Sequence, residues 1–379
     1  MTDATSVRVL LTNRTLARRS GSELYVWDLA NGLRARGHDP VVYAPTLGPL
    51  AHQLSVATIP VVDDLRRVSV APDVIHGQHN HELITALLNF PGVPAVRVCH
   101  GWGDQPVQQF PRILRYVAVD ETVRDRMVSE WGVPADRVHV ILNFADTGRF
   151  TPRGPLPARP ARALVFNNYA AQHLPIVTRA CDRLGITVEG AGISVGRIAD
   201  APERMLGQYD VVFAKARCAI EALAVGTAVV VCDQAGMGPL VTSANLEDLR
   251  RLNFGVRTLR EPISVDSLVR EISRYDAADA ALVSRRIRAT ASLDLALARW
   301  IDVYNEVIDE HRAASPGDLD AEFRAASEYL RSIVLQPPPA PAADFLRRVY
   351  FSAERSKLFR ALLPSRATAG RLAAWLRSS

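Results

Sequence analysis

The chain has 379 residues, of which 48% are hydrophobic and 22% are charged, with a formal net charge of +5. This length predicts about two domains with full apolar cores and a terminal extension, and the composition is typical of a folded globular protein. No run of about 18 apolar residues occurs, which argues against a transmembrane helix. The start MTDATSVRVLLTN lacks the basic and long apolar regions of a secretion signal, so we expect a cytoplasmic protein.

The sequence predicts neither a metal site nor a disulfide framework. Its cysteines have no C-x-x-C spacing, which is typical of buried thiols in a reducing compartment. Histidines near predicted strand ends, such as His79 and His81, have no acidic partner at a metal-binding spacing. The four cysteines are Cys99, Cys181, Cys218 and Cys232.

The basic residues are concentrated at the C-terminal end. Residues 341–379 contain eight basic side chains and only two acidic ones, so this tail accounts for the whole positive excess. The body in front of it is close to neutral, which argues against a nucleic-acid surface.

The first half of the chain begins with a βαβ pattern. An apolar strand is predicted at 7–12, an amphipathic helix at 23–36 and a second strand at 40–44. Gly21 and Ser22 precede the helix, where backbone N–H groups at the carboxyl edge of a sheet can receive an anion. A plain tight turn explains this Gly-Ser pair equally well.

More alternating strands and helices follow. Strands are predicted at 72–76 and 95–99, and the second of them ends in His100 and Gly101. The glycine allows a ligand to approach the backbone closely, although a structural histidine remains an open alternative. Further elements are a strand at 116–120, a helix at 121–131, a strand at 138–142 and a proline-rich interdomain linker at 151–162.

The stretch Tyr209 to Asp233 is the most informative part of the second half. It predicts a strand at 211–213, a turn with Lys215 and Arg217, a helix carrying Glu221 and a strand at 228–232. In a βαβ unit this turn lies at the carboxyl edge of a parallel sheet. Two cations beside a carboxylate at a helix start suit a phosphate joined to a hydroxyl-bearing sugar.

Five segments in this order resemble GT-B glycosyltransferases of the retaining kind and are similar to glycosyltransferase family 4. They cover roughly residues 7–260. The segments are SGSELYVWDLANGLRARGHDPVVYAP, PDVIHGQHNH, VRVCHG, VAVDETVRDRMVSEWGVPADRVHVILNFADTGRF and AIEALAVGTAVVVCDQAG.

The resemblance implies an α/β fold with two Rossmann-like domains that face each other across a cleft. Residues 1–155 would form the acceptor-side domain, and residues 156–312 the nucleotide-sugar domain. A late helix at 282–310, with Trp300 and Tyr304, would cross back onto the first domain as a hinge. Residues 313–379 would form a helical, basic extension.

The same resemblance implies the activity. A retaining, metal-independent transferase of the hexosyltransferase type would move a sugar from a nucleotide-diphosphate sugar to an acceptor hydroxyl. The nucleotide-diphosphate sugar would be a co-substrate, and no other cofactor would be needed. His100 would contact the donor sugar and Glu221 the ribose, while Gly21 and Ser22 would lie near the donor phosphates. The remaining expected donor-binding residues are Asn143, and Gly236 and Gly238 in a glycine-rich loop at 233–240.

Two departures from the family pattern concern charge. The first glutamate of its E-x7-E motif would fall near Phe213 or Ala214, where no acid stands, and the Arg/Lys pair opening the second domain is absent from LVFNNYAAQHLP. Because only Lys215 and Lys357 are lysine among 45 basic residues, a lysine in the ligand-facing turn is an unusual choice. We therefore expect Lys215 and Arg217 to neutralise the diphosphate and to act with His100 in catalysis. The alternative is a catalytically degenerate GT-B scaffold that binds or stabilises a partner.

The C-terminal segments predict a helix at 321–335 and two basic helices beyond it. The basic helices suit either peripheral contact with the inner face of a membrane or packing on the body or on a second subunit. No motif specifies the base, the sugar or the acceptor, which could be a glycan, a lipid-linked compound or a small molecule.

Overall fold

The computed structural model of the chain describes residues 6–101, 104–199, 201–314 and 317–334. Its contacts divide the chain into two units, residues 1–318 and 319–379. In the second unit, α12 (Leu319–Val334) corresponds to the predicted helix at 321–335. The two predicted basic helices of the tail lie outside the described residues, so their membrane and subunit interpretations stay predictions. No helix among the described residues is long and apolar enough to cross a membrane.

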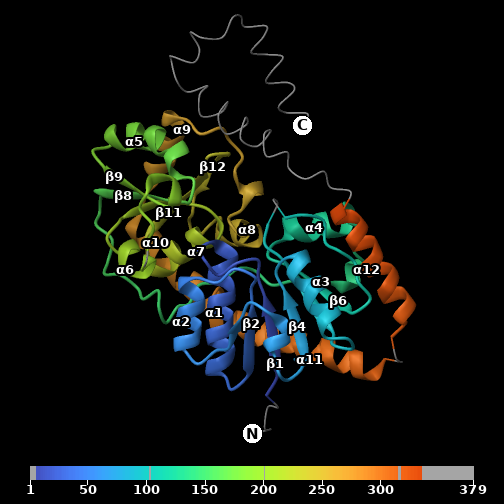
Figure 1. Cartoon of the computed structure of the whole chain (residues 1–379). Coiled ribbons are helices and arrows are strands. Elements are labelled where there is room, and N and C mark those ends of the chain that lie inside the picture. The colour runs from blue at the N-terminus through green and yellow to red at the C-terminus, as the bar shows by residue number, and fades with distance from the viewer. Residues whose placement is uncertain (1–5, 102–103, 200, 315–316, 335–379) are drawn as a thin grey trace, which may run out of the picture. The chain divides into compact units, whose positions relative to one another are not determined.

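The first unit contains two α/β domains, each built on one sheet (Figure 1). The first domain has seven parallel strands in the order β3-β2-β1-β4-β5-β6-β7, which contains the Rossmann-type order 3-2-1-4-5-6. Its elements are β1 (Arg8–Thr12), α1 (Gly21–Ala35), β2 (Asp39–Tyr43), α2 (Pro49–Val56), β3 (Val61–Val62), β4 (Val74–Gly77), α3 (Asn80–Asn89), β5 (Ala95–Cys99), β6 (Ile113–Ala118), α4 (Glu121–Ser129) and β7 (Val138–Val140).

The second domain has five strands in the order β12-β11-β10-β8-β9, and only β12 is antiparallel to its neighbour. Counted from β8, the order is the 2-1-3-4-5 order of flavodoxin-like sheets. Its elements, with the helices that follow, are β8 (Arg162–Phe166), α5 (Leu174–Asp182), β9 (Thr187–Ala191), α6 (Pro202–Leu206), β10 (Val211–Ala214), α7 (Ala216–Val225), β11 (Ala228–Asp233), β12 (Gly236–Leu240), α8 (Leu246–Arg251), α9 (Val265–Ile272), α10 (Ala277–Thr290) and α11 (Leu293–Ala313).

The central strands form because most of their side chains are apolar on both faces, with Arg97 in β5 and Asp233 in β11 as charged exceptions. Every residue of β5, β10 and β11 is buried. Parallel strands covered by helices on both sides have continuous apolar runs of this kind. The prediction of an α/β fold with two Rossmann-like domains is therefore confirmed.

Two predicted elements were wrong in detail. The predicted glycine-rich loop at 233–240 contains strand β12, because Gly236 to Leu240 pairs with β11 and Met237 also exchanges backbone hydrogen bonds with Glu261. The predicted helix at 282–310 is broken at Ala291 and Ser292 into α10 and α11. Ser292 caps α11 through its side chain, and the backbone of Ala145 hydrogen-bonds on both sides of the break.

Helix α11 follows the second domain in sequence but packs on the first. It contacts α1, β4, β5 and β6, and in Figure 1 it lies in orange beside β4. Trp300 and Tyr304 are fully buried there. The indole N–H of Trp300 donates to the hydroxyl of Tyr25 over 2.8 Å, so α11 contributes both packing and polar contacts to the core of the first domain.

Candidate active site

The topology of each sheet indicates where a ligand would bind. In open α/β sheets, ligands bind outside the carboxyl ends of the strands, at the point where the strand order reverses. That point lies between β1 and β4 in the first domain and between β8 and β10 in the second. The segments that leave these strands carry Gly21, Lys215 and Arg217, and His100 follows β5, the next strand along.

At the edge of the first sheet, α1 begins at Gly21. The carboxylate of Glu23 accepts from the backbone N–H groups of Arg18 and Ser20 over 2.8 and 2.9 Å and so fixes the loop before the helix. A Cβ added to Gly21 would meet nothing within 4 Å, so the space above this backbone is open. Because Gly21, Tyr25 and Asp28 are separated by four and three residues, they lie on one face of α1.

His100 follows β5 and lies against Tyr25, with ring centroids 4.9 Å apart in an edge-to-face arrangement. Its backbone N–H donates to Asp104 over 2.6 Å. Burial lowers the pKa of His100 to about 4, since the opposing effect of Asp104 is weaker and Arg97 and Arg217 lower the pKa further. The imidazole is therefore neutral at pH 7 and can serve as a hydrogen-bonding group rather than as a cation.

A chain of buried hydrogen bonds sets the tautomer of His100. The ring Nδ1 of His76 lies 2.7 Å from the hydroxyl of Tyr304, and its Nε2 lies 2.7 Å from the amide nitrogen of Gln78. The amide oxygen of Gln78 contacts Nε2 of His100. Since the amide nitrogen of Gln78 donates to His76, its oxygen accepts from His100, which leaves Nδ1 of His100 as an acceptor. Helix α11 thus reaches the candidate site through Tyr304, His76 and Gln78.

At the edge of the second sheet, only Lys215 separates β10 from α7. Phe213 and Ala214, where the family acid would fall, are fully buried within β10. The chain has no loop at this point on which an acid could be presented. The absence of the first glutamate therefore has a structural reason.

The backbone around this short connection is strained. Ala216, Asn253 and Phe254 have positive φ angles of 51°, 54° and 50°, which are unusual for residues other than glycine. They form one cluster, because the N–H of Ala216 donates to the carbonyl of Phe254 over 3.0 Å. Clustered strain of this kind is more frequent at ligand sites than elsewhere.

The side chain of Lys215 forms an ion pair with Asp233, which is buried at the end of β11. Its exposed fraction is 32%, so it remains accessible from the site. His173 is buried nearby, and burial lowers the pKa of its imidazole against the opposing effect of Asp233. Lys215 and His173 thus share one carboxylate neighbour at this edge.

Arg217 links the two domains. Its guanidinium pairs with Asp28 on α1, and its Nε donates to Glu221 over 2.7 Å. Asp28 is also paired with Arg149 over 2.8 Å. Burial alone would lower the pKa of Arg217, but the carboxylates of Asp28 and Glu221 outweigh it and raise the pKa. Burial also raises the pKa of Glu221, although Arg217 opposes this shift.

The structure therefore brings some of the predicted residues together and leaves others apart. His100, Arg217 and Glu221 lie close together, since Arg217 pairs with Glu221 and lowers the pKa of His100. The guanidinium carbon of Arg217 also lies 6.0 Å from the ring centroid of Phe144, the residue after Asn143. Lys215 precedes Arg217 by two residues and points to Asp233 instead.

Three predicted donor-binding residues have structural partners in this arrangement. Asn143 is buried, and its carbonyl accepts from Arg250 over 2.6 Å. Gly236 and Gly238 are buried in β12, where an added Cβ would meet the carbonyl oxygens of Glu261 and Thr258. Close packing of neighbouring backbone thus accounts for both glycines. Ser22 lies in the open first turn of α1, half-buried beside Gly21.

Sequence reasoning missed Asp28, Gln78 and Asp233, which orient the residues that it found. Asp28 had one detectable feature, because it is an acid on the otherwise apolar face of the helix LYVWDLANGL. Gln78 and Asp233 follow or end apolar strands and carried no such pattern.

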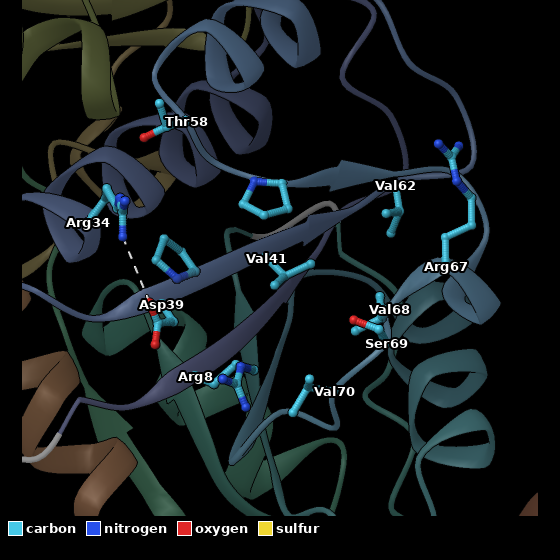
Figure 2. A pocket seen from close by; sticks show the side chains of 12 residues that line it. Arg8, Arg34, Asp39, Val41, Thr58, Val62, Arg67, Val68, Ser69 and Val70 are labelled. Carbon is cyan, nitrogen blue, oxygen red and sulfur yellow. Dashed lines mark ion pairs between the residues drawn. The ribbon is translucent and has the colours of Figure 1, made fainter.

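Two cavities lie elsewhere in the first unit. One of about 720 Å³ lies between the domains and is lined by α4, by the segment after β7 that includes Phe144, by Arg250 and Arg251, and by the junction of α10 and α11. The other, of about 390 Å³, is shown in Figure 2. Arg8 and Asp39, which line it, begin β1 and β2, so it lies at the opposite end of the strands from the candidate site. Arg34 there points to Asp39 at 3.8 Å.

Comparisons with known proteins agree with this architecture. The fold and the paired carboxyl edges are those of the GT-B class. Residues 19–149 match the model of Glycosyltransferase Family 4, which covers most of the first domain. None of the curated proteins compared with the chain matches it.

Several solved structures share the fold. A glycosyltransferase from Rickettsia africae aligns with a TM-score of 0.59 and 14% identity over 80% of this chain and 99% of its own. Anabaena Alr3699/HepE, in complex with UDP and glucose, aligns with a TM-score of 0.56 and 15% identity over 79% of this chain and 99% of its own. AviGT4, a glycosyltransferase of avilamycin A biosynthesis, aligns with a TM-score of 0.51 and 15% identity over 80% of this chain and 98% of its own.

Proposed function

We propose that the protein is a glycosyltransferase that moves a sugar from a nucleotide-diphosphate sugar to an acceptor hydroxyl. The observation that carries this proposal is the contact between the carboxyl edges of the two sheets. Arg217, at the start of α7, pairs with Asp28 of the first domain and lies close enough to His100 to lower its pKa. The family match of the first domain supports it. So do the structures of Alr3699/HepE with UDP and with UDP-glucose.

The proposed chemistry uses the residues of both edges. As the bond between the sugar carbon and the diphosphate oxygen breaks, negative charge develops on the diphosphate. Lys215 and the free N–H groups in the first turn of α7 would stabilise this charge without a metal. The N–H of Ala216 is not among them, because it already donates to the carbonyl of Phe254. Nδ1 of His100 would accept a hydrogen bond from a hydroxyl of the sugar, a hexose.

Retention of configuration follows if the acceptor oxygen attacks the face that the diphosphate leaves. The proton of the acceptor hydroxyl would pass to the departing diphosphate. Arg217 has a different role in this proposal from that of Lys215. Its side chain is only 10% exposed and is already paired with Asp28 and Glu221, so it would hold the two domains and the ribose ligand Glu221 in place.

The decisive experiment substitutes Lys215. Thermal-shift screening against nucleoside diphosphates and nucleotide sugars would first identify the base and the sugar. Lys215→Ala should then lower turnover with that donor by about 100-fold, because one charge-stabilising contact to the leaving group is lost. Arg183→Ala, which removes an exposed cation from the same domain, should leave turnover within twofold of wild type. Equal turnover in both variants would remove the proposed role of Lys215.

One observation favours the alternative of a binding scaffold without catalysis. Lys215 and Arg217 each already have a carboxylate partner, so neither is a free cation. A scaffold would bind the nucleotide sugar, if at all, without forming product. Saturable product formation with any donor of the panel would exclude it.

A further inference from the structure

The loop between β1 and α1 carries a cluster of arginines that the proposed chemistry does not use. Arg14, Arg18 and Arg19 lie within six residues, and no acid occurs from residue 13 to residue 22. Within the described part of the chain none of the three guanidinium groups has a hydrogen bond or an ion pair. We propose that these arginines bind an oxyanion, namely a phosphate or carboxylate group of the acceptor. The assignment to the acceptor rests on the proposed function.

The loop is fixed in the position that such a site needs. It leaves the carboxyl end of β1 at the point where the strand order reverses, next to Gln78, whose N–H donates to Thr12 over 3.3 Å. Glu23 is fully buried, and its carboxylate accepts from the loop backbone rather than from an arginine side chain. Arg14 and Arg18 are exposed and Arg19 is half-buried, so all three can reach a ligand.

A fourth arginine lies buried beneath this edge. Arg97 on β5 is 2% exposed and donates to the carbonyl of Gln78 over 2.7 Å and to the side-chain oxygen of Asn80 over 3.1 Å. Both partners are neutral, and no described carboxylate forms an ion pair with it. A buried guanidinium is costly unless anions offset its charge. Asp104 acts on Arg97 without forming an ion pair with it, and a further anion would add to this offset.

The titration of neighbouring groups shows the sign of the local field. Burial lowers the pKa of His79 to about 3, and Arg97, His100 and Arg14 lower it further, whereas Asp104 acts in the opposite direction. Burial alone would raise the pKa of Asp104, but His100 and Arg97 outweigh it. Among the groups that act on His79, Arg97 and Arg14 are cations and Asp104 is the acid, so the charge around His79 is positive.

The place of the loop in the fold indicates which substrate the arginines serve. The loop follows β1 of the first sheet, whereas Lys215 and α7, where the donor diphosphate is proposed to bind, follow β10 of the second sheet. Arginine forks match the geometry of phosphate and carboxylate groups, so an acidic acceptor fits this position.

The test uses inorganic phosphate as a probe of the full chain. The protein is first saturated with the nucleoside diphosphate that it binds, and phosphate is then titrated calorimetrically at low ionic strength, where such contacts are screened least. We expect wild type to bind phosphate and the triple variant Arg14→Gln, Arg18→Gln, Arg19→Gln to bind it at least tenfold more weakly. The control variant Arg159→Gln, Arg179→Gln, Arg285→Gln removes the same charge from three exposed arginines and should stay within twofold of wild type.

Each outcome decides a separate point. Equal phosphate affinity of wild type and the loop variant would overturn the oxyanion site. Failure of wild type to bind phosphate would overturn it as well. Loss of nucleoside diphosphate affinity in the loop variant would overturn the assignment to the acceptor and give the arginines to the donor. Phosphate binding that depends on the loop, in a protein that transfers no sugar from any donor, would support the oxyanion site and overturn only the proposed function.

Discussion

At the carboxyl edge of the second sheet, Lys215 and Arg217 are each paired with a buried carboxylate, whereas at the edge of the first sheet neither Arg14 nor Arg97 forms an ion pair with a described carboxylate. The first arrangement fixes side chains before any ligand binds. The second leaves positive charge that a ligand can neutralise. We infer from this contrast that the second edge is preorganised for the leaving group. At the first edge, a negatively charged substrate would neutralise part of the positive charge of the arginines.

The strongest way to break this comparison is to remove the pairing at the second edge. Arg217→Met keeps much of the side-chain volume but leaves the buried carboxylate of Glu221 without its cation and Asp28 with Arg149 alone. Loss of one partner from a buried pair costs about 3–5 kcal/mol of unfolding free energy. Urea denaturation followed by circular dichroism would measure it.

The matched control is Arg257→Met. Arg257 also pairs across the domains, with Asp125 at 2.7 Å, but these side chains are 44% and 46% exposed. Its loss should cost less than about 1 kcal/mol. If the two variants were equally stable, the buried cluster would not be what holds the domains together.

The burial and charge around His79, at the edge of the first sheet, can be tested by pH. His79 keeps a pKa of about 3 in the folded protein, below the usual value of 6.5, so the unfolded chain binds more protons between these values. Stability must therefore fall as the pH decreases from about 7.5 to 5, by about 2 kcal/mol from this histidine alone. His79→Gln should lose about that much less than wild type over the same range in urea denaturation. An unchanged pH dependence would show that burial and the neighbouring arginines do not keep His79 neutral.

The smallest effect on stability concerns the glycines of the two edges. Gly21 has open space where a Cβ would stand, so Gly21→Ala should leave the unfolding free energy unchanged or raise it by about 0.5 kcal/mol, since alanine favours the helix. Its turnover should nevertheless fall if a substrate approaches the backbone there. Gly238→Ala, at a position crowded by Thr258, should lose about 1 kcal/mol or more. Thermal unfolding together with donor kinetics would separate the two effects, and full activity of Gly21→Ala would mean that no ligand group lies over α1.

Much of the fold could be predicted because the strands are locally specified. The strand at 95–99 was predicted with its observed bounds, since four of its five residues are apolar and this local pattern needs no tertiary information. Strand β12 could not be predicted in this way. Its Gly-Met-Gly-Pro sequence has low strand propensity, and it is extended because β11 and the segment around Glu261 pair with it.

The site was predictable only in part, for a related reason. Lys215, Arg217 and Glu221 are close in sequence and were found together, whereas their partners are distant along the chain. Asp28 lies on another domain from Arg217, and His76 receives Tyr304 from a helix that follows the second sheet. Such pairs are set by how domains pack, which no local pattern records.

The return of α11 to the first domain also has a consequence for the order of folding. Proteins are synthesised from the N-terminus, and early domains commonly fold first. Here, Tyr25 and His76 lack the partners Trp300 and Tyr304 until more than two hundred further residues have left the ribosome. The domain that is made first can therefore complete its core only after the second has been synthesised.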